Sequence, residues 1–191
     1  MGGIQPHFPT LALVAIFSRH QEALQWGVVK LQEMLGPVAL ESPDFEFEET
    51  RFYTKEMGEG LRKRLVLFEP WYDAGRLAEC KLQSNAWEEE LGKAGSFAEP
   101  RPLNIDPGYL TLAKFVLATT KDREHRLYLR DGIYAEQTLY FAHKQWHPRP
   151  WTYPDYRRPD FHLFFNAARR YLKDKLIREA EAGPWEEEIS Q

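Results

Sequence analysis

The sequence predicts an α+β protein with a ferredoxin-like βαββαβ core, extended by a further helix, a β-hairpin and a C-terminal helix. This prediction rests first on the order of the patterns, because apolar runs of strand length alternate with apolar positions at helical spacing. It rests second on the pair Asp131-Gly132 between two alternating runs, a strong short-range signal for a hairpin. The 191 residues and the 43% hydrophobic content fit one globular domain.

The first patterns are a strand and an amphipathic helix. The continuous apolar run 10–17 has strand length and predicts a central strand that is covered on both faces. Ser18 and Gln21 have the spacing of a capping box, so they predict the start of a helix. Apolar residues recur at helical spacing from Leu24 to Leu35, and Gly36-Pro37 predicts the helix end.

The rest of the core follows this helix. Apolar and acidic residues alternate at 45–49, and the run 61–69 predicts another strand. Asp73 is expected to cap a helix. The buried face of that helix is predicted to hold Leu77, Cys80, Ser84, Trp87 and Leu91. Cys80 on this face is interpreted as a small buried hydrophobe rather than a reactive thiol. A short strand at 101–105 would complete the βαββαβ order.

Beyond the core, Asp106-Pro107 predicts the start of a further helix, because Asp caps free amides and Pro fits the first helical position. Leu110 and Leu117 continue the helical spacing, although the β-branched end of this run, 116–120, also fits a strand. The runs 126–130 and 133–142 then predict the two strands of the hairpin.

The C-terminal third begins with an aromatic segment, 146–159, in which proline recurs four times. We expect no regular element there, but rather a segment packed over the domain. Asp160 predicts the start of a last helix. The expected organisation is a flexible lead-in at 1–9, a single domain at 10–182 and a disordered acidic tail at 183–191.

Charge is unevenly distributed along the chain. The formal net charge is −4, but residues 114–175 hold 13 Lys and Arg against 7 Asp and Glu. A basic segment within an acidic protein suits a small anionic ligand better than a long polyanion, which argues against nucleic acid as a partner. The same charges would also fit a solvated surface without a ligand.

Three features predict a cytoplasmic protein. A single cysteine permits no internal disulfide, which is typical of a reducing compartment. No apolar run approaches the roughly 18–20 residues that cross a bilayer. The first residues lack the basic start and the apolar stretch of a secretory signal.

Polar residues gather on both sides of the apolar run 110–118, and they form the predicted site. Lys121 would hold a phosphate or carboxylate as a point charge, and Arg126 as a bidentate fork. The predicted ligand-binding residues are Asn104, Tyr109, Thr120, Lys121, Arg126, Tyr128, Tyr134 and Tyr153.

Two residues are the candidates for acid–base catalysis. His125 is a candidate because histidine is the side chain most often used as a general acid or base. Glu136 lies among apolar neighbours, so it is paired or protonated if it points inward. If it points outward, it is an ordinary surface residue of a strand.

Several common chemistries are disfavoured. The sequence contains neither of the two common glycine-rich phosphate loops, and no nucleophile elbow. His143 and His147 are four residues apart, but Pro148 and the strand context exclude a helix there, so no metal site is predicted. The sequence identifies no cofactor.

Six stretches carry a resemblance to a known family: 52–58, 104–114, 118–122, 125–128, 131–136 and 151–156. On these stretches the chain resembles an uncharacterised bacterial family catalogued as domain of unknown function 4416. The resemblance implies one whole domain from Thr10 to the last helix, and it brings no activity, substrate or catalytic residue.

Two functions stay open at this point. The first is an enzyme or sensor whose pocket binds a small phosphorylated or nucleotide-like anion, with His125 or Glu136 transferring protons. The second is a non-catalytic interaction module, or a homodimer, that uses the aromatic segment 146–159 as its surface.

Overall fold

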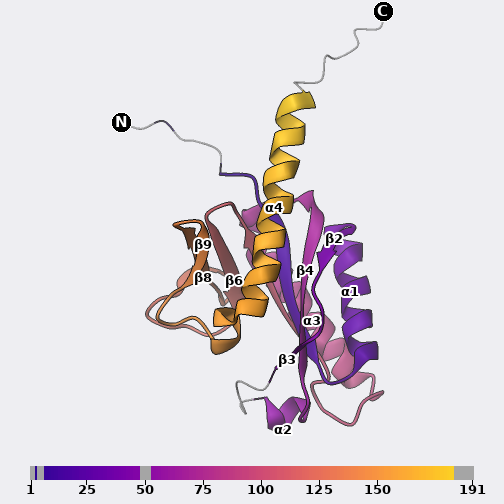
Figure 1. Ribbon diagram of the computed structural model, residues 1–191. Coiled ribbons are helices and arrows are strands. Elements are labelled where there is room, and N and C mark those ends of the chain that lie inside the picture. Colours follow the sequence, from indigo (N-terminus) through magenta and orange to yellow (C-terminus); the bar gives the residue numbers. More distant parts are fainter. Residues whose placement is uncertain (1–2, 4–6, 48–52, 183–191) are drawn as a thin grey trace, which may run out of the picture.

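The computed structural model describes residues 3, 7–47 and 53–182 (Figure 1). All strands of the described part belong to one antiparallel sheet, whose main order is β2-β4-β1-β5-β6-β8-β7, with β3 paired to β4 and β9 paired to β8. The strands are β1 (Leu11–Ser18), β2 (Val38–Glu41), β3 (Phe45–Glu46), β4 (Arg62–Trp71), β5 (Asn104–Leu110), β6 (Lys114–Thr119), β7 (Leu127–Arg130), β8 (Ile133–Ala142) and β9 (Gln145–Pro148). The α-helices are α1 (Gln21–Leu35), α2 (Thr54–Met57), α3 (Leu77–Lys93) and α4 (Pro159–Ala182), and the 3₁₀ turns are η1 (Ala74–Arg76) and η2 (Pro154–Arg157).

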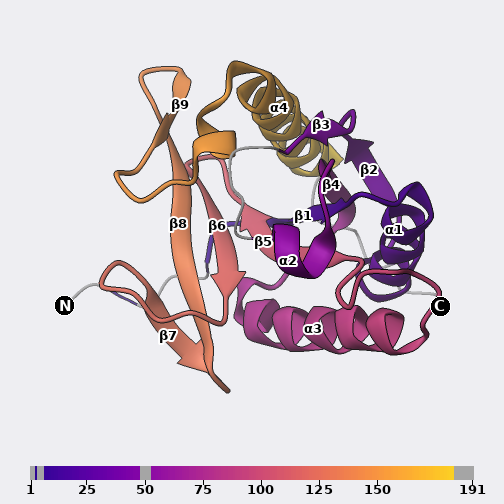
Figure 2. The same cartoon turned by 90° about the horizontal axis from the view of Figure 1, so that it is seen from below.

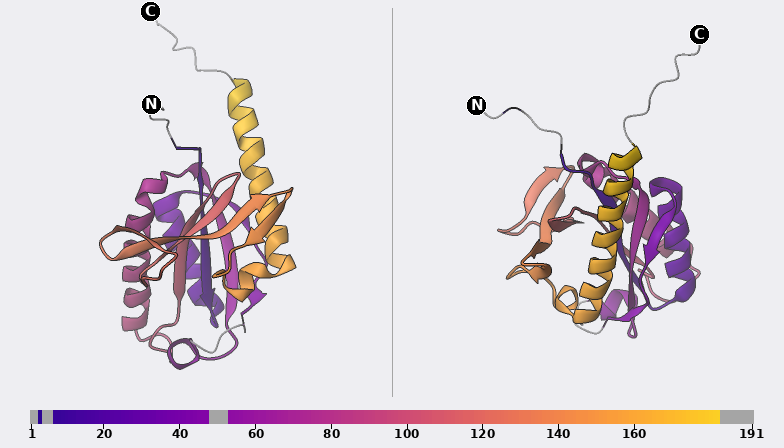
Figure 3. Two further views of the ribbon diagram at one scale, coloured as in Figure 1. Left: turned by 90° about the vertical axis from the view of Figure 1, so that its left-hand side faces the viewer. Right: turned by 45° about the horizontal axis from the view of Figure 1, so that its top comes forward.

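Helices cover both faces of the sheet, so the predicted α+β class is confirmed. Figure 2 shows α1 and α3 on one side of the sheet and α4 on the other. Apolar residues of α1 and α3 pack with Val14 and Ile16 of β1, whereas Phe165 of α4 packs with Leu13 and Leu65. The C-terminal turns of α4 project beyond the sheet (Figure 3), and they are exposed.

The central strand and the first helix follow the sequence closely. All eight residues of β1 are buried, as predicted for a strand covered on both faces. The buried face of α1 includes the predicted Leu24, Val28, Leu31 and Leu35, and Gly36 ends the helix. The predicted capping box is wrong, because Ser18 belongs to β1 and His20 holds the N-cap position. The Ser18 hydroxyl instead donates to the carbonyl of Pro102 at 2.6 Å.

The predicted helix after Asp106 is wrong. Residues 104–110 form β5, which pairs with β1 along its whole length, and 114–119 form β6, as the alternative for 116–120 had suggested. Pro107 is tolerated because backbone groups along a strand point alternately to its two sides. Ile105, two residues earlier, directs its N–H and C=O away from β1, and Pro107 has the same orientation.

β5 and β6 pair only where they leave their connecting turn. The ladder joins Gly108 to Leu117, Tyr109 to Val116 and Leu110 to Phe115, and it stops there. Towards Asn104 the two strands diverge, so the β6 side of β5 lies open to α3. There Ile105 donates its N–H to Oε1 of Glu88 at 2.7 Å, and its carbonyl accepts from Nζ of Lys81 at 2.7 Å. Side chains of α3 thus replace a neighbouring strand.

The predicted hairpin is confirmed. β7 and β8 are joined by Asp131 and Gly132, with φ angles of 52° and 76°, as a type I′ turn requires. The expectation of no regular element at 146–159 is wrong in part. β8 turns back through His143 and Lys144, at φ 48° and 63°, into β9, and η2 follows.

Some expectations concern residues outside the described part. The predicted acidic tail 183–191 lies wholly outside it, and the lead-in 1–9 is described only at residues 3 and 7–9. In the described ranges no helix is both long and apolar enough to cross a membrane.

A substitution at Gly108 tests how closely β5 approaches β6. A Cβ at this position would collide with the backbone carbonyl oxygen of Val116, and backbone cannot move aside like a flexible side chain. We expect Gly108→Ala to lower the free energy of unfolding by about 1–3 kcal/mol, measured by urea denaturation. Gly3→Ala is the control, because nothing lies within 4 Å of its Cβ. Equal stability of both variants would contradict this packing.

Candidate functional site

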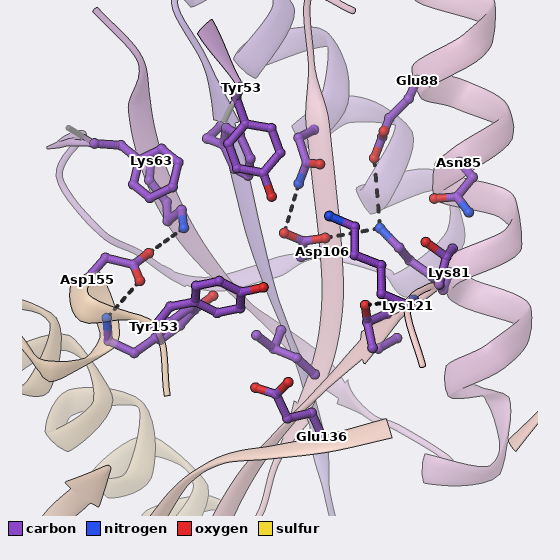
Figure 4. Close-up of a pocket in the computed structure, with 18 of the residues that line it drawn as sticks. Tyr53, Lys63, Lys81, Asn85, Glu88, Asp106, Lys121, Glu136, Tyr153 and Asp155 are labelled. Carbon is purple, nitrogen blue, oxygen red and sulfur yellow. Dashed lines mark hydrogen bonds and ion pairs between the residues drawn. The ribbon is translucent and has the colours of Figure 1, made fainter. Parts of the chain in front are cut away.

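A cavity of about 560 Å³ opens where β5 and β6 diverge (Figure 4). This volume lies in the range of small-molecule sites, roughly 300–1,000 Å³. Its walls come from the sheet, α3, the loop after β6 and the η2 segment. The lining residues are Phe17, Phe47, Tyr53, Lys63, Lys81, Asn85, Glu88, Arg101, Asn104, Asp106, Leu117, Ala118, Thr119, Thr120, Lys121, Arg123, Arg126, Glu136, Tyr153, Pro154, Asp155 and Tyr156.

Strand register brings the polar floor of the cavity together. Paired residues of an antiparallel sheet point to the same face, and so do residues two apart. Lys63 and Asn104 both pair with Phe17. Asp106 follows Asn104 by two residues, and Glu136 reaches the same face through its partner Leu117. This is the face that α4 covers farther along the strands.

A closed ring of charged and polar side chains holds the opening between β5 and α3. Lys81 contacts Asp106 Oδ1 at 3.0 Å and Glu88 Oε1 at 3.9 Å. Glu88 Oε2 accepts from Arg101 at 2.7 Å, and Arg101 donates to Asn104. The Asn104 amide closes the ring by donating to Asp106 Oδ2 at 2.8 Å. Because each member contacts two others, the ring fixes its own geometry.

The ring shifts the pKa values of its two acids in opposite directions. Burial alone would raise the pKa of Asp106, but the positive charges of Lys81 and Lys63 outweigh it and lower that pKa. At Glu88 burial prevails over the attraction of Lys81 and Arg101, so its pKa is raised.

On the opposite wall, Lys63 and Asp155 form a buried ion pair enclosed by aromatic rings. The Lys63 ammonium lies 3.8 Å from the ring centroid of Phe47, 5.0 Å from that of Phe17 and 5.3 Å from that of Tyr156. Cation–π attraction therefore adds to the ion pair, and it fixes the η2 segment against the sheet.

The sequence left open whether the Glu136 side chain points inward or outward. In the structure it points inward and is paired. The residue is only 3% exposed. Its Oε2 accepts from Arg126 Nε at 2.8 Å and lies 3.2 Å from His125 Nε2. The His125 ring in turn stacks on Trp151, with ring centroids 4.7 Å apart. Arg126 also donates to the carbonyl of Lys121 at 2.8 Å, so it fastens the loop after β6.

The cavity carries an excess of positive charge. Among its described lining residues, six Lys and Arg face four Asp and Glu, which leaves a formal charge of +2. The pairs above use Lys63, Lys81, Arg101 and Arg126. Burial and the nearby cations Arg101 and Arg126 lower the pKa of Lys121, whereas Asp106 opposes this shift. Arg123 is exposed at the rim.

The structure gathers six of the ten predicted site residues around the cavity and leaves four outside its lining. Those in the lining are Asn104, Thr120, Lys121, Arg126, Glu136 and Tyr153. His125 is outside the lining and contacts the Glu136 carboxylate. Tyr109 packs with the core on the α1 and α3 side. Tyr128 and Tyr134 pair edge to face on the hairpin, with centroids 5.3 Å apart.

Sequence reasoning missed much of the charged lining. Lys81 and Glu88 occupy the apolar stripe of α3, one turn from Leu77 and Ser84, and a charge within such a stripe is a usable signal. Lys63 alternates with Leu65 and Leu67, which also predicts an inward direction. Arg101 and Asp155 lie in segments without periodicity, and nothing in their neighbourhood pointed to the cavity. Cys80, as predicted, is buried, and burial raises the pKa of its thiol to about 12.

Asp106→Asn tests the charge of the ring. The pKa of Asp106 is lower in the folded protein than in the unfolded chain, so its stabilising effect is present at neutral pH and is lost as pH falls through the folded value. We expect the variant to lose about 3 kcal/mol of unfolding free energy at pH 7, measured by urea denaturation. The difference from wild type should shrink below pH ~4.

The exposed Asp122→Asn serves as the control and should match wild type at every pH. A deficit of Asp106→Asn that stayed constant down to pH ~3 would contradict an ionised Asp106 in the ring.

Comparison with known proteins identifies the family of this chain. Residues 9–171 match the family described as Domain of unknown function (DUF4416). No curated protein and no solved structure matches the chain. Because the match covers most of the 191 residues, including every strand and every cavity-lining residue that the structure describes, the chain belongs to the DUF4416 family.

Proposed function

We propose that the cavity binds a small phosphorylated or nucleotide-like anion. The observation that carries this proposal is the formal charge of +2 on the described lining residues of a cavity large enough for such a ligand. Four of the cations are already held in place by carboxylates, so the field they create is preorganised rather than assembled on binding.

The phosphate would lie at the loop after β6. Arg123 is exposed at the rim, where its guanidinium can turn towards an anion and bind two of its oxygens. Lys121 extends into the cavity in Figure 4 and adds a second positive charge. Arg126 supports the loop through the carbonyl of Lys121 and is the less available donor.

Aromatic side chains suit the remainder of such a ligand. Phe17, Phe47, Tyr53, Tyr153 and Tyr156 all line the cavity; three of these rings are buried around Lys63, whereas Tyr153 is exposed. Aromatic faces are the usual partners of nucleobases and of the apolar faces of sugars. An anion with a ring attached therefore fits the lining better than inorganic phosphate.

Acid–base chemistry in this cavity would depend on Glu136 and His125. Glu136 lines the cavity, and His125 contacts it from behind at 3.2 Å. The Glu136 carboxylate can take a proton from an O–H group of a ligand and become a neutral acid, while His125 and Arg126 hold its other oxygen in place. If the protein is an enzyme, Glu136 is thus the group in the cavity that accepts a proton from the ligand, and His125 supports it.

Two finer features complete the proposal. The order β2-β4-β1-β5, antiparallel throughout and joined by α1 and α3, supports a ferredoxin-like core that β6–β9 extend. The one buried thiol, Cys80, supports a cytoplasmic location.

The alternative function, a protein-binding or homodimer surface at 146–159, has weaker support. Trp146 and Tyr156 are buried in the core beneath α4. Trp151 stacks on His125 and donates its indole N–H to the carbonyl of Gln137 at 3.0 Å. Most of the aromatic area of this segment thus packs against its own chain.

A ligand screen tests the proposal. Inorganic phosphate, AMP and glucose 6-phosphate would be compared by thermal shift and then by calorimetric titration. A ligand at 100 times its Kd should stabilise the protein by about 2.7 kcal/mol. Arg123→Ala should weaken binding about tenfold, because it removes a charge-assisted contact.

Arg130→Ala is the matched control, because Arg130 is similarly exposed but pairs with Asp131 on the hairpin, outside the cavity lining. It should bind like wild type. If none of these anions stabilised wild type, or if Arg123→Ala and Arg130→Ala bound equally well, the proposal would fall.

A further inference from the structure

One carboxylate oxygen in the cavity differs from all the others. Glu88, Asp106 and Asp155 each have a donor at both oxygens within the protein. At Glu136, Oε2 carries the contacts to Arg126 and His125, whereas Oε1 has no hydrogen-bond partner among the described residues. Figure 4 shows the Glu136 carboxylate turned towards the interior of the cavity.

Burial makes this unpaired oxygen informative. The side chain of Glu136 is only 4% exposed, and Oε1 is not among the fully buried atoms without a partner, so what is exposed of it faces the cavity. An acceptor that is open only to a cavity and has no donor in the protein is usually satisfied there by water or a ligand. The stacking of His125 on Trp151 and the bond from Arg126 hold Oε2, so rotation of the carboxylate would break contacts.

The chemistry of a carboxylate restricts what can bind there. An ionised carboxylate accepts hydrogen bonds and donates none, so a phosphate or carboxylate oxygen of the ligand is repelled. The ligand must present an O–H or N–H group to Oε1. The excess positive charge of the lining disfavours an ammonium group, which leaves a neutral donor.

Asn85 offers a second polar group to such a donor. It lines the cavity from α3, one turn after Lys81, and its carboxamide makes no hydrogen bond with the described residues. A carboxamide both donates and accepts, which matches the hydroxyl group of a ligand. Figure 4 places Asn85 and Glu136 on different walls, so two hydroxyl-binding positions are available.

We infer that the ligand is a hydroxylated phosphate ester, a sugar phosphate or a ribonucleotide, and that Glu136 selects it by accepting a hydrogen bond from a sugar hydroxyl. This inference rests on the proposed function, because the phosphate is held by Arg123 and Lys121. It adds the class of ligand and names a residue that determines specificity. Phosphates without hydroxyls bind more weakly because Oε1 then stays unpaired.

Calorimetric titration with pairs of ligands tests the inference. AMP is compared with 2′,3′-dideoxyadenosine monophosphate, and glucose 6-phosphate with hexyl phosphate, which has no hydroxyl on its chain. Wild type should bind the hydroxylated member at least about tenfold more tightly. The pair that shows the preference distinguishes a nucleotide from a simple sugar phosphate.

Glu136→Gln is the decisive variant, because it keeps the shape of the side chain and removes its charge. Its carboxamide can still bond a hydroxyl, but without the help of a charge, so we expect the preference for the hydroxylated ligand to fall severalfold while the phosphate is still bound. Glu124→Gln is the matched control: Glu124 is 87% exposed, lies 3.6 Å from His125 and is outside the cavity lining. Thermal melting of each variant verifies folding. If Glu136→Gln does not fold, Glu136→Asp takes its place: it keeps the charge but is one methylene shorter, so its carboxylate should reach the hydroxyl less well and reduce the same preference.

The outcomes separate the two proposals. If wild type bound none of the phosphates, the proposed function would fall and this inference with it. If wild type bound hydroxylated and hydroxyl-free phosphates equally, or if Glu136→Gln kept the full preference, the anion site would stand and the role of Glu136 would be wrong.

Discussion

The backbone of Ile105 is bonded by two side chains of α3 at the point where β5 separates from β6. A strand edge inside a protein cannot be left without partners, because an unpaired buried amide or carbonyl costs as much as a lost hydrogen bond. Lys81 and Glu88 supply these partners. Their charges are themselves costly to bury, and the ring through Asp106 and Arg101 compensates for them.

The cavity exists because side chains of α3, rather than β6, bond this part of the β5 backbone. A sheet in which β6 continued beside β5 would have no space between them, and the side chains of Lys81 and Glu88 would have no acceptor or donor to reach. Because α3 takes over the pairing, the strands can diverge, and the floor of the opening is formed by Asn104, Asp106 and Glu136. The fixed ion pairs around it form a polar surface that needs little reorganisation when a ligand enters.

Much of the fold was predictable where a local signal agreed with the tertiary structure. The uninterrupted apolar run of β1, the helical spacing of α1 and α3 and the Asp131-Gly132 turn all satisfied this condition. The helix expected at Asp106-Pro107 failed because its local signal was outweighed by pairing with β1, which supplies hydrogen bonds along the whole of β5. The β8–β9 hairpin turns through His143 and Lys144, two residues that seldom take positive φ. The sequence therefore does not predict a turn there.

The sequence by itself determined which segments are strands and helices along most of the core, and it located a polar cluster at Thr120, Lys121, Arg126 and Glu136, because periodicity and residue chemistry are local properties. Only the tertiary structure decided what faces that cluster. Lys63, Lys81, Glu88 and Asp155 come from segments up to 92 residues apart, and each is buried because it has a partner of opposite charge. Pairing across such distances is fixed by strand register and helix packing, and these depend on the whole chain at once.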